Sequence, residues 1–157
     1  MKDVVEVSVK KVNREQSEGR RLALQVLFQA DVQGPEFLIE QLPRFIAEQT
    51  THTLVREIAT RYAAGTWDYR ETADRWISRL VPKWSVSRMA PVDRNVIRMA
   101  MWELSHVPET PSKVVLDEAI NIAREFSTQD SASFVNGVLD AALKEHLALI
   151  APAAASQ

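Results

Sequence analysis

The sequence contains no cysteine among its 157 residues. Disulfide bonds, thiolate catalysis and cysteine-based zinc sites are therefore excluded. The chain also lacks any uninterrupted apolar run close to the ~20 residues that a membrane-spanning helix requires. Its N-terminus has no apolar core of the kind found in signal peptides. From these absences we expect a cytoplasmic protein with no membrane segment.

Glycine is scarce as well, and the four glycines are isolated, so no phosphate-binding glycine loop is present. His52, His106 and His146 lie in separate segments and form no close-spaced pair of metal ligands. Asp117 and Glu118 are adjacent, and neighbours on a helix point about 100° apart. No catalytic constellation emerges. We expect no enzyme activity, no metal and no cofactor.

The composition is that of an ordinary soluble domain, 46% hydrophobic and 25% charged. The net charge of −2 is unevenly divided. Residues 1–98 hold 16 Lys/Arg and 13 Asp/Glu, whereas residues 99–157 hold 3 and 8. The basic part suits phosphates and the acidic part suits a basic protein.

Apolar residues recur at helical spacing along most of the chain, and no strand finds a partner. The helical segments are residues 17–31, 36–50, 51–81, 91–104, 110–126 and 130–143, two of them interrupted by Pro43 or Gly65. Pro43 either kinks its segment or begins a second helix. The pattern predicts an all-α protein of about seven helices. We expect a flexible arm over residues 1–16, one helical domain over residues 17–150, and a disordered tail over residues 151–157.

The segment from residue 130 to residue 143 has a broad apolar face, which predicts a central helix buried by several neighbours. Asn136 and Gly137 interrupt it, and a glycine inside a helix costs roughly 1 kcal/mol relative to alanine. We therefore expect a second helix backbone to cross closely at Gly137, and a buried Asn136 to have partners for its amide. Asp130 or Ser131 is expected to cap this helix.

Basic residues cluster near the start of the first helix, where Arg14, Arg20 and Arg21 follow two lysines. Further along, tryptophans alternate with arginines and lysines, Trp84 between Lys83 and Arg88 among them. Such groups can hold an RNA backbone and stack on unpaired bases. The alternative is that the tryptophans belong to the core and that the arginines are solvated.

Four stretches together resemble one known family. They are RRLALQVLF at residues 20–28, MAPVDRNVIRMAMWEL at residues 89–104, the stretch 111–126 that ends in EAINIAREF, and SASFVNGVLD at residues 131–140. In this combination and order the motifs resemble the NusB family of transcription antitermination factors. The similarity extends over roughly residues 17–146.

The resemblance implies a fold of two packed three-helix subdomains. It implies binding to the boxA RNA element together with the ribosomal protein NusE. The pair would join other Nus factors on elongating RNA polymerase, suppress termination and support ribosomal RNA synthesis. Family members include monomers and homodimers, so both states stay open.

The resemblance also implies a set of RNA-binding residues. Arg20 matches an arginine of the family's basic first-helix motif, and Arg14 and Arg21 lie beside it. Asp130 and Ser131 match the loop-to-helix segment beside the RNA. Ser133 stands where some members carry lysine.

This chain departs from the family pattern in its charge. Residues 16–19 read QSEG, where several members have a dense arginine run. Fewer phosphate contacts weaken RNA binding and flatten its salt dependence. An alternative function is therefore a helical protein–protein adaptor of the same fold that binds little RNA. A third is an RNA methyltransferase, since a similar helical domain precedes some of those enzymes, but no cofactor-binding α/β domain follows in this sequence.

Overall fold

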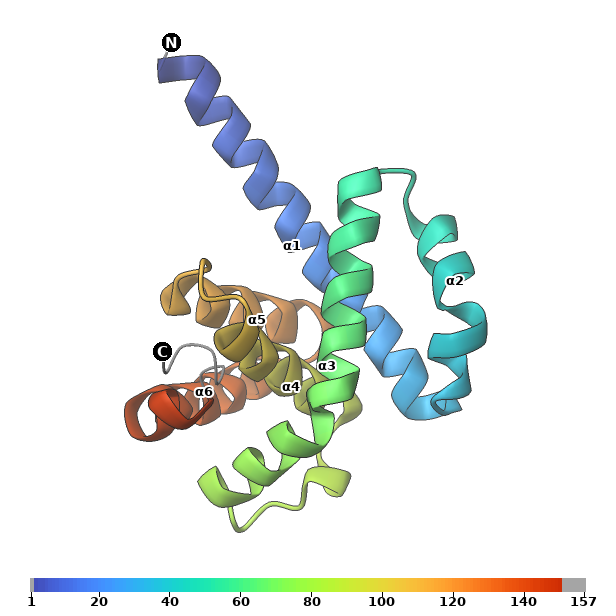
Figure 1. Ribbon diagram of the computed structural model, residues 1–157. Helices are drawn as coiled ribbons and strands as arrows, with labels where there is room; N and C mark the ends of the chain where they lie inside the picture. Colours follow the sequence, from blue (N-terminus) through green and yellow to red (C-terminus); the bar gives the residue numbers. More distant parts are fainter. Residues whose placement is uncertain (1, 151–157) are drawn as a thin grey trace. The chain divides into compact units, whose positions relative to one another are not determined.

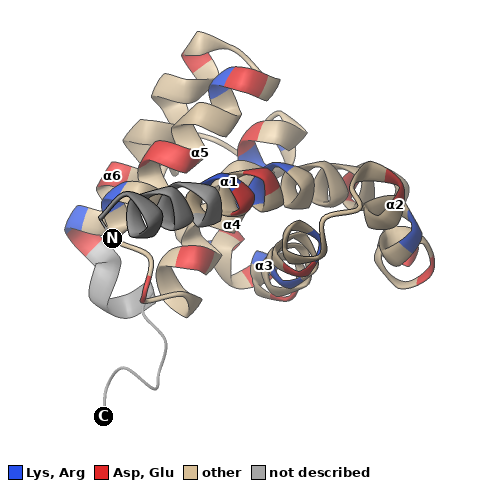
Figure 2. Cartoon of the chain, turned by 90° about the horizontal axis from the view of Figure 1, so that it is seen from above, with Lys and Arg blue, Asp and Glu red and all other residues tan. Residues whose placement is uncertain are grey.

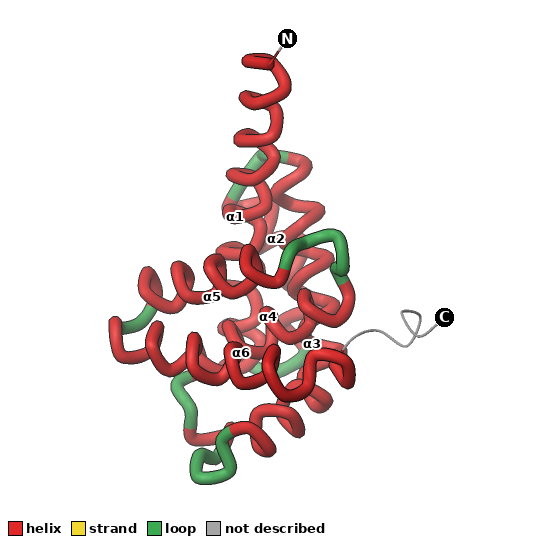
Figure 3. The backbone as a smooth tube through the Cα atoms, turned by 90° about the vertical axis from the view of Figure 1, so that its left-hand side faces the viewer, coloured by secondary structure: helices red, strands yellow, loops and turns green. Residues whose placement is uncertain are grey.

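The computed structural model of the chain describes residues 2–150, and the side chains of residues 13–145. Every regular element in that range is helical, which confirms the all-α prediction (Figures 1 and 3). The described residues form six α-helices, close to the predicted number of about seven. They are α1 (Lys2–Gln33), α2 (Leu42–Gln49), α3 (Thr53–Leu80), α4 (Pro91–His106), α5 (Ser112–Phe126) and α6 (Gln129–Ile150), with a π-helical turn at Phe37–Gln41 and a 3-10 turn at Val86–Arg88.

The chain divides into two compact units, residues 1–64 and residues 65–157. Residues 2–16 belong to α1, and the flexibility of this arm stays a prediction. The predicted disordered tail, residues 151–157, lies outside the described residues. No helix in the described part of the chain combines the length and the apolarity needed to cross a membrane.

In the first unit, α1 packs against the π-helical turn and α2. Its buried stripe consists of apolar side chains spaced as a helix requires, namely Leu22, Ala23, Leu24, Val26, Leu27 and Ala30. Gly34 ends the turn after α1 with a φ of 112°, a conformation that glycine adopts without strain. Pro43 lies in the first turn of α2, where no backbone donor is needed. Pro43 therefore begins a second helix rather than kinking one continuous helix.

A close helix approach occurs at Gly19 in this unit. A Cβ atom at this position would come within 2.4 Å of Ile58 Cγ2 on α3. Only a residue without a side chain fits there, so Gly19 allows α1 and α3 to approach each other.

In the second unit, α4, α5 and α6 each pack against the other two. α4 is the central helix, because the side chains from Asn95 to Glu103 are all buried. The broad apolar face of α6 is also buried, through Ala132, Val135, Val138, Leu139 and Ala142. The opposite face of α6 is exposed, so the prediction that this helix is the one surrounded by neighbours is wrong.

The expectation of a close crossing at Gly137 is wrong for the same reason. Gly137 and Asn136 are exposed, and a Cβ atom at Gly137 would meet nothing within 4 Å. The close crossing lies at Gly65 instead, where a Cβ atom would come within 2.4 Å of the Trp102 ring. Sequence alone does not distinguish a glycine that faces a neighbouring helix from one that faces solvent.

An ion pair lies inside the second unit between α3 and α4. Arg98 Nε and Nη2 donate to the two carboxylate oxygens of Asp74, each at 2.7 Å. Arg98 also donates to Asn95 Oδ1 at 3.2 Å, and Asn95 donates to the Pro91 carbonyl at 2.8 Å. The Arg98 side chain is only 9% exposed. A bidentate pair of this kind fixes the relative position of two helices.

Candidate nucleic-acid interface

The three predicted arginines of α1 do not share one environment. Arg14 and Arg21 are exposed, whereas Arg20 is only 3% exposed. The Arg20 guanidinium lies 5.6 Å from the centre of the Tyr62 ring, and its Nη2 is 3.5 Å from Gln16 Oε1. Arg14 and Arg21 are therefore the members of this trio that present charge to solvent. Arg20 packs inward, where it can support the helix that carries them.

Acidic residues lie between these arginines on the part of α1 whose side chains are described, which Figure 2 draws in colour. One of them, Glu15, is buried and lies 2.9 Å from His52 Nε2 at the start of α3. The carboxylate of Glu15 therefore points into the first unit. Glu18 is exposed and remains beside Arg21. The exposed charge of this helix is mixed rather than purely basic.

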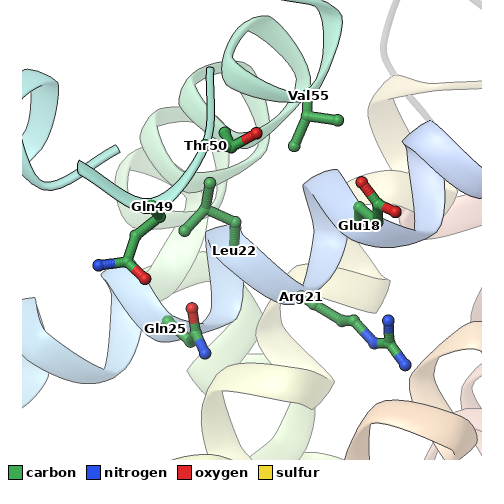
Figure 4. A pocket seen from close by; sticks show the side chains of 7 residues that line it. All are labelled: Glu18, Arg21, Leu22, Gln25, Gln49, Thr50 and Val55. Atoms are coloured by element: carbon green, nitrogen blue, oxygen red, sulfur yellow. The ribbon is translucent and has the colours of Figure 1, made fainter. Parts of the chain in front are cut away.

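Arg21 also borders a pocket of about 210 Å³ within the first unit (Figure 4). The lining residues come from α1, from the end of α2, from the connection that follows it and from the start of α3: Glu18, Arg21, Leu22, Gln25, Gln49, Thr50 and Val55. The floor is apolar and the rim is polar. Two amides and one pair of opposite charges at the rim can hydrogen-bond a planar polar group.

The wall of this pocket is fixed by Arg56. Its Nε donates to the Thr50 carbonyl at 2.6 Å, and its Nη2 donates to the Ala47 carbonyl at 3.1 Å. The His52 backbone N–H donates to Thr50 Oγ1 at 3.1 Å. These bonds hold the chain reversal between α2 and α3 in one conformation.

In the second unit, Asp130, Ser131 and Ser133 lie in the first turns of α6. Asp130 and Ser133 are exposed, and Ser131 is half-buried. The capping residue is Thr128, whose Oγ1 accepts the Ser131 backbone N–H at 3.1 Å. The expectation that Asp130 or Ser131 caps this helix is therefore wrong, because the helix begins slightly earlier.

The Ser131 side chain has a structural partner. Its Oγ donates to Asp93 Oδ2 in the first turn of α4 at 3.1 Å, and lies 2.8 Å from Ser127 Oγ. This bond ties the start of α6 to the start of α4. Ser131 thus positions the segment that presents Asp130 and Ser133.

The exposed side of α6 continues beyond these residues with Asn136, Gly137 and Asp140. Asp140 Oδ2 lies 2.9 Å from Lys144 Nζ. Its hydrogen bond and its charge raise the pKa of Lys144 above the ordinary value. This pair of opposite charges adds little net charge to the surface.

The predicted site residues thus fall into two groups, one in each unit: Arg14, Arg20 and Arg21 on α1, and Asp130, Ser131 and Ser133 on α6. Side chains in a metal-binding arrangement are not found among the residues that the structure describes. What the two groups offer is exposed charge and hydrogen-bonding capacity at helix surfaces.

Comparison with known proteins agrees with the motifs. A family model described as the NusB family matches residues 17–144. The chain belongs to the NusB family.

Named relatives carry the same description. The transcription antitermination protein NusB of Symbiobacterium thermophilum is 38% identical over 137 residues, covering 80% of this chain and 86% of the relative. The protein of the same name from Acidothermus cellulolyticus is 41% identical over 127 residues, covering 80% and 84%.

Solved structures show the same fold. The T. maritima NusB structure matches with a TM-score of 0.72 at 36% identity, covering 84% of this chain and 92% of that one. A structure of antitermination factors NusB and NusE in complex with dsRNA matches with a TM-score of 0.74 at 23% identity, covering 85% and 98%. At that lower identity the likeness concerns the fold alone.

Proposed function

We propose that this protein is an RNA-binding transcription antitermination factor without catalytic activity. Membership of the NusB family over residues 17–144 carries the proposal, because relatives named transcription antitermination proteins share 38–41% of their residues with it over most of its length. In this proposal the protein binds boxA RNA together with the ribosomal protein NusE. The pair then acts with other Nus factors on elongating RNA polymerase, in the cytoplasm, and supports ribosomal RNA synthesis.

Exposure suggests a different role for each predicted residue. Arg14 and Arg21 would contact phosphates, because their charges face solvent. Asp130 and Ser133 would meet the RNA at the start of α6. Arg20 and Ser131 would position these residues through their contacts with Tyr62 and Asp93.

One observation favours the second candidate function, a protein–protein adaptor of the same fold. Arg20 is buried, so of the three predicted arginines only Arg14 and Arg21 are left to reach phosphates, and the exposed Glu18 lies beside Arg21. Because phosphate contacts dominate RNA affinity, a weakened basic surface favours partner binding over RNA binding.

Fluorescence anisotropy of labelled boxA RNA and of a scrambled RNA distinguishes the two functions. Each RNA is titrated at two salt concentrations with the protein alone and with NusE. We expect preferential boxA binding that NusE strengthens and salt weakens. Equal, weak binding of both RNAs with NusE still bound would identify the adaptor.

Arg21→Ala tests the assignment of the basic surface. Losing one phosphate contact should reduce the magnitude of the salt slope by roughly 0.7 for single-stranded RNA. Arg44→Ala is the matched control, because Arg44 is an exposed arginine of the same unit that pairs with Glu48 on α2. An Arg21 variant that behaves like the Arg44 variant would remove Arg21 from the interface.

A further inference from the structure

Trp84 is a solvent-exposed tryptophan. It lies in the connection between α3 and α4 and is 60% exposed, whereas Trp102 is 5% exposed and Trp67 and Trp76 are half-buried. Its ring centre is 6.0 Å from that of Phe134 on α6, with the two planes at 62°. This is an edge-to-face contact, which supports the indole and leaves most of its surface accessible.

The loop that carries Trp84 is held by hydrogen bonds. The Trp84 backbone N–H donates to the Val81 carbonyl at 3.0 Å. Arg94 Nη1 donates to the carbonyls of Ser87 at 3.2 Å and Met89 at 3.4 Å, and the Met89 side chain is buried. The exposed indole is thus presented in a fixed position, so little ordering cost is left for binding.

Two cations lie in the same connection as Trp84: Lys83 directly precedes it, and Arg88 ends the 3-10 turn that follows it. Lys83 and Arg88 are exposed, and within residues 13–145 neither has an ion pair or a side-chain hydrogen bond. An aromatic face with cations nearby is the combination by which proteins hold single-stranded nucleic acid. Asp130 lies one helical turn before Phe134. Its carboxylate can accept hydrogen bonds from the bases or sugars of the RNA but repels phosphates, which favours a path of the RNA backbone along Lys83 and Arg88.

We propose that Trp84 is a stacking platform for one unpaired base of single-stranded RNA, and that Lys83 and Arg88 bind the neighbouring phosphates. The inference rests on the proposed RNA-binding function and extends it to a loop outside the residues assigned above. Phe134, which directly follows Ser133, connects this platform to the predicted RNA-binding segment of α6. The platform accepts any base, since every base has a π face.

A scan with abasic boxA RNAs, each lacking one base, tests the platform. Full-length wild-type protein and the Trp84→Leu variant are titrated with every RNA of the series. Leucine keeps an apolar contact with Phe134 but offers no aromatic face. In the wild type, removing the stacked base should weaken binding about 5- to 140-fold, the equivalent of the ~1–3 kcal/mol of one stacked base.

In Trp84→Leu, the same abasic position should carry no penalty, and intact boxA should bind more weakly by the same factor. Trp84→Phe should fall between the two, because phenylalanine retains a smaller ring. The salt slope should not change in either variant, whereas Lys83→Gln with Arg88→Gln should reduce its magnitude by roughly 1.4. Ile39→Ala, which truncates an 81% exposed apolar side chain of the first unit, is the control and should bind like wild type.

The possible results distinguish failure of the stacking platform from failure of the proposed antitermination function. If wild-type protein prefers boxA and Trp84→Leu shows the same affinity and abasic profile, the platform is wrong and the function stands. If Trp84→Leu keeps its RNA binding but loses NusE, the indole belongs to a protein interface. If the wild type shows no preference for boxA, the proposed function fails; the platform fails as well only if no abasic position weakens binding in the wild type or if Trp84→Leu leaves that penalty unchanged.

Discussion

α4 and α6 both contain long stretches of the family motif, yet the second unit uses them differently. In α4 the polar motif residues Asn95 and Arg98 are buried and bonded to their surroundings. In α6 Asn136 and Gly137 are exposed, and a Cβ atom at Gly137 would meet nothing within 4 Å. The α4 motif is therefore explained by packing within the chain. The exposed part of the α6 motif has no such explanation, and nothing in the structure accounts for the glycine.

The largest effect should come from breaking the α4 network. Arg98→Ala leaves the carboxylate of Asp74, which is 31% exposed, without its bidentate partner. Because water can reach this carboxylate, we expect a loss of about 2–3 kcal/mol of folding stability, less than the ~3–5 kcal/mol of a fully buried ion pair. Urea unfolding would measure the loss as a lower midpoint. Arg75→Ala, at an exposed position of α3, should change stability by no more than ~0.5 kcal/mol. Equal midpoints for the two variants would contradict a structural role for Arg98.

A smaller effect should follow at the close crossing of α3 and α4. In Gly65→Ala the new methyl group meets the buried ring of Trp102, and overpacking of a core typically costs ~1–3 kcal/mol. Thermal unfolding should show a lower Tm. An unchanged Tm would mean that the Trp102 ring moves aside without cost.

The smallest effect has the opposite sign. Gly137→Ala adds a methyl group in open space on a helix, so it should stabilise the protein by up to ~1 kcal/mol through helix propensity. For a chain of this size the gain corresponds to a rise in Tm of about 2–4 °C. A destabilised Gly137 variant would show that the exposed face of α6 is packed in solution. Gly65→Ala and Gly137→Ala serve as controls for each other, because the same methyl group is added at a packed position in one and at an exposed position in the other.

Sequence reasoning reached the fold class and most helix positions, because apolar spacing records which face of a helix is buried. It could not assign the environment of single positions. Arg20 and Arg21 are adjacent in sequence, yet one is buried against Tyr62 and the other is exposed. Gly65 and Gly137 likewise differ only in what lies opposite them.

The surroundings of the candidate site residues could not be predicted from the sequence either. The motif indicated the segment around Ser131, but its bond to Asp93 joins residues 38 positions apart, which no local pattern encodes. Trp84 was visible as one of several tryptophans between basic residues. Its exposure and its contact with Phe134 emerge only from the fold.

In the second unit, helices that are consecutive in the chain pack against each other, and this affects how fast the unit folds. α4, α5 and α6 follow one another in the chain and contact one another in space, so their core closes through short loops. Proteins dominated by such local contacts fold within microseconds to milliseconds. We therefore expect this three-helix core to assemble rapidly during synthesis, as soon as the last of these helices has left the ribosome.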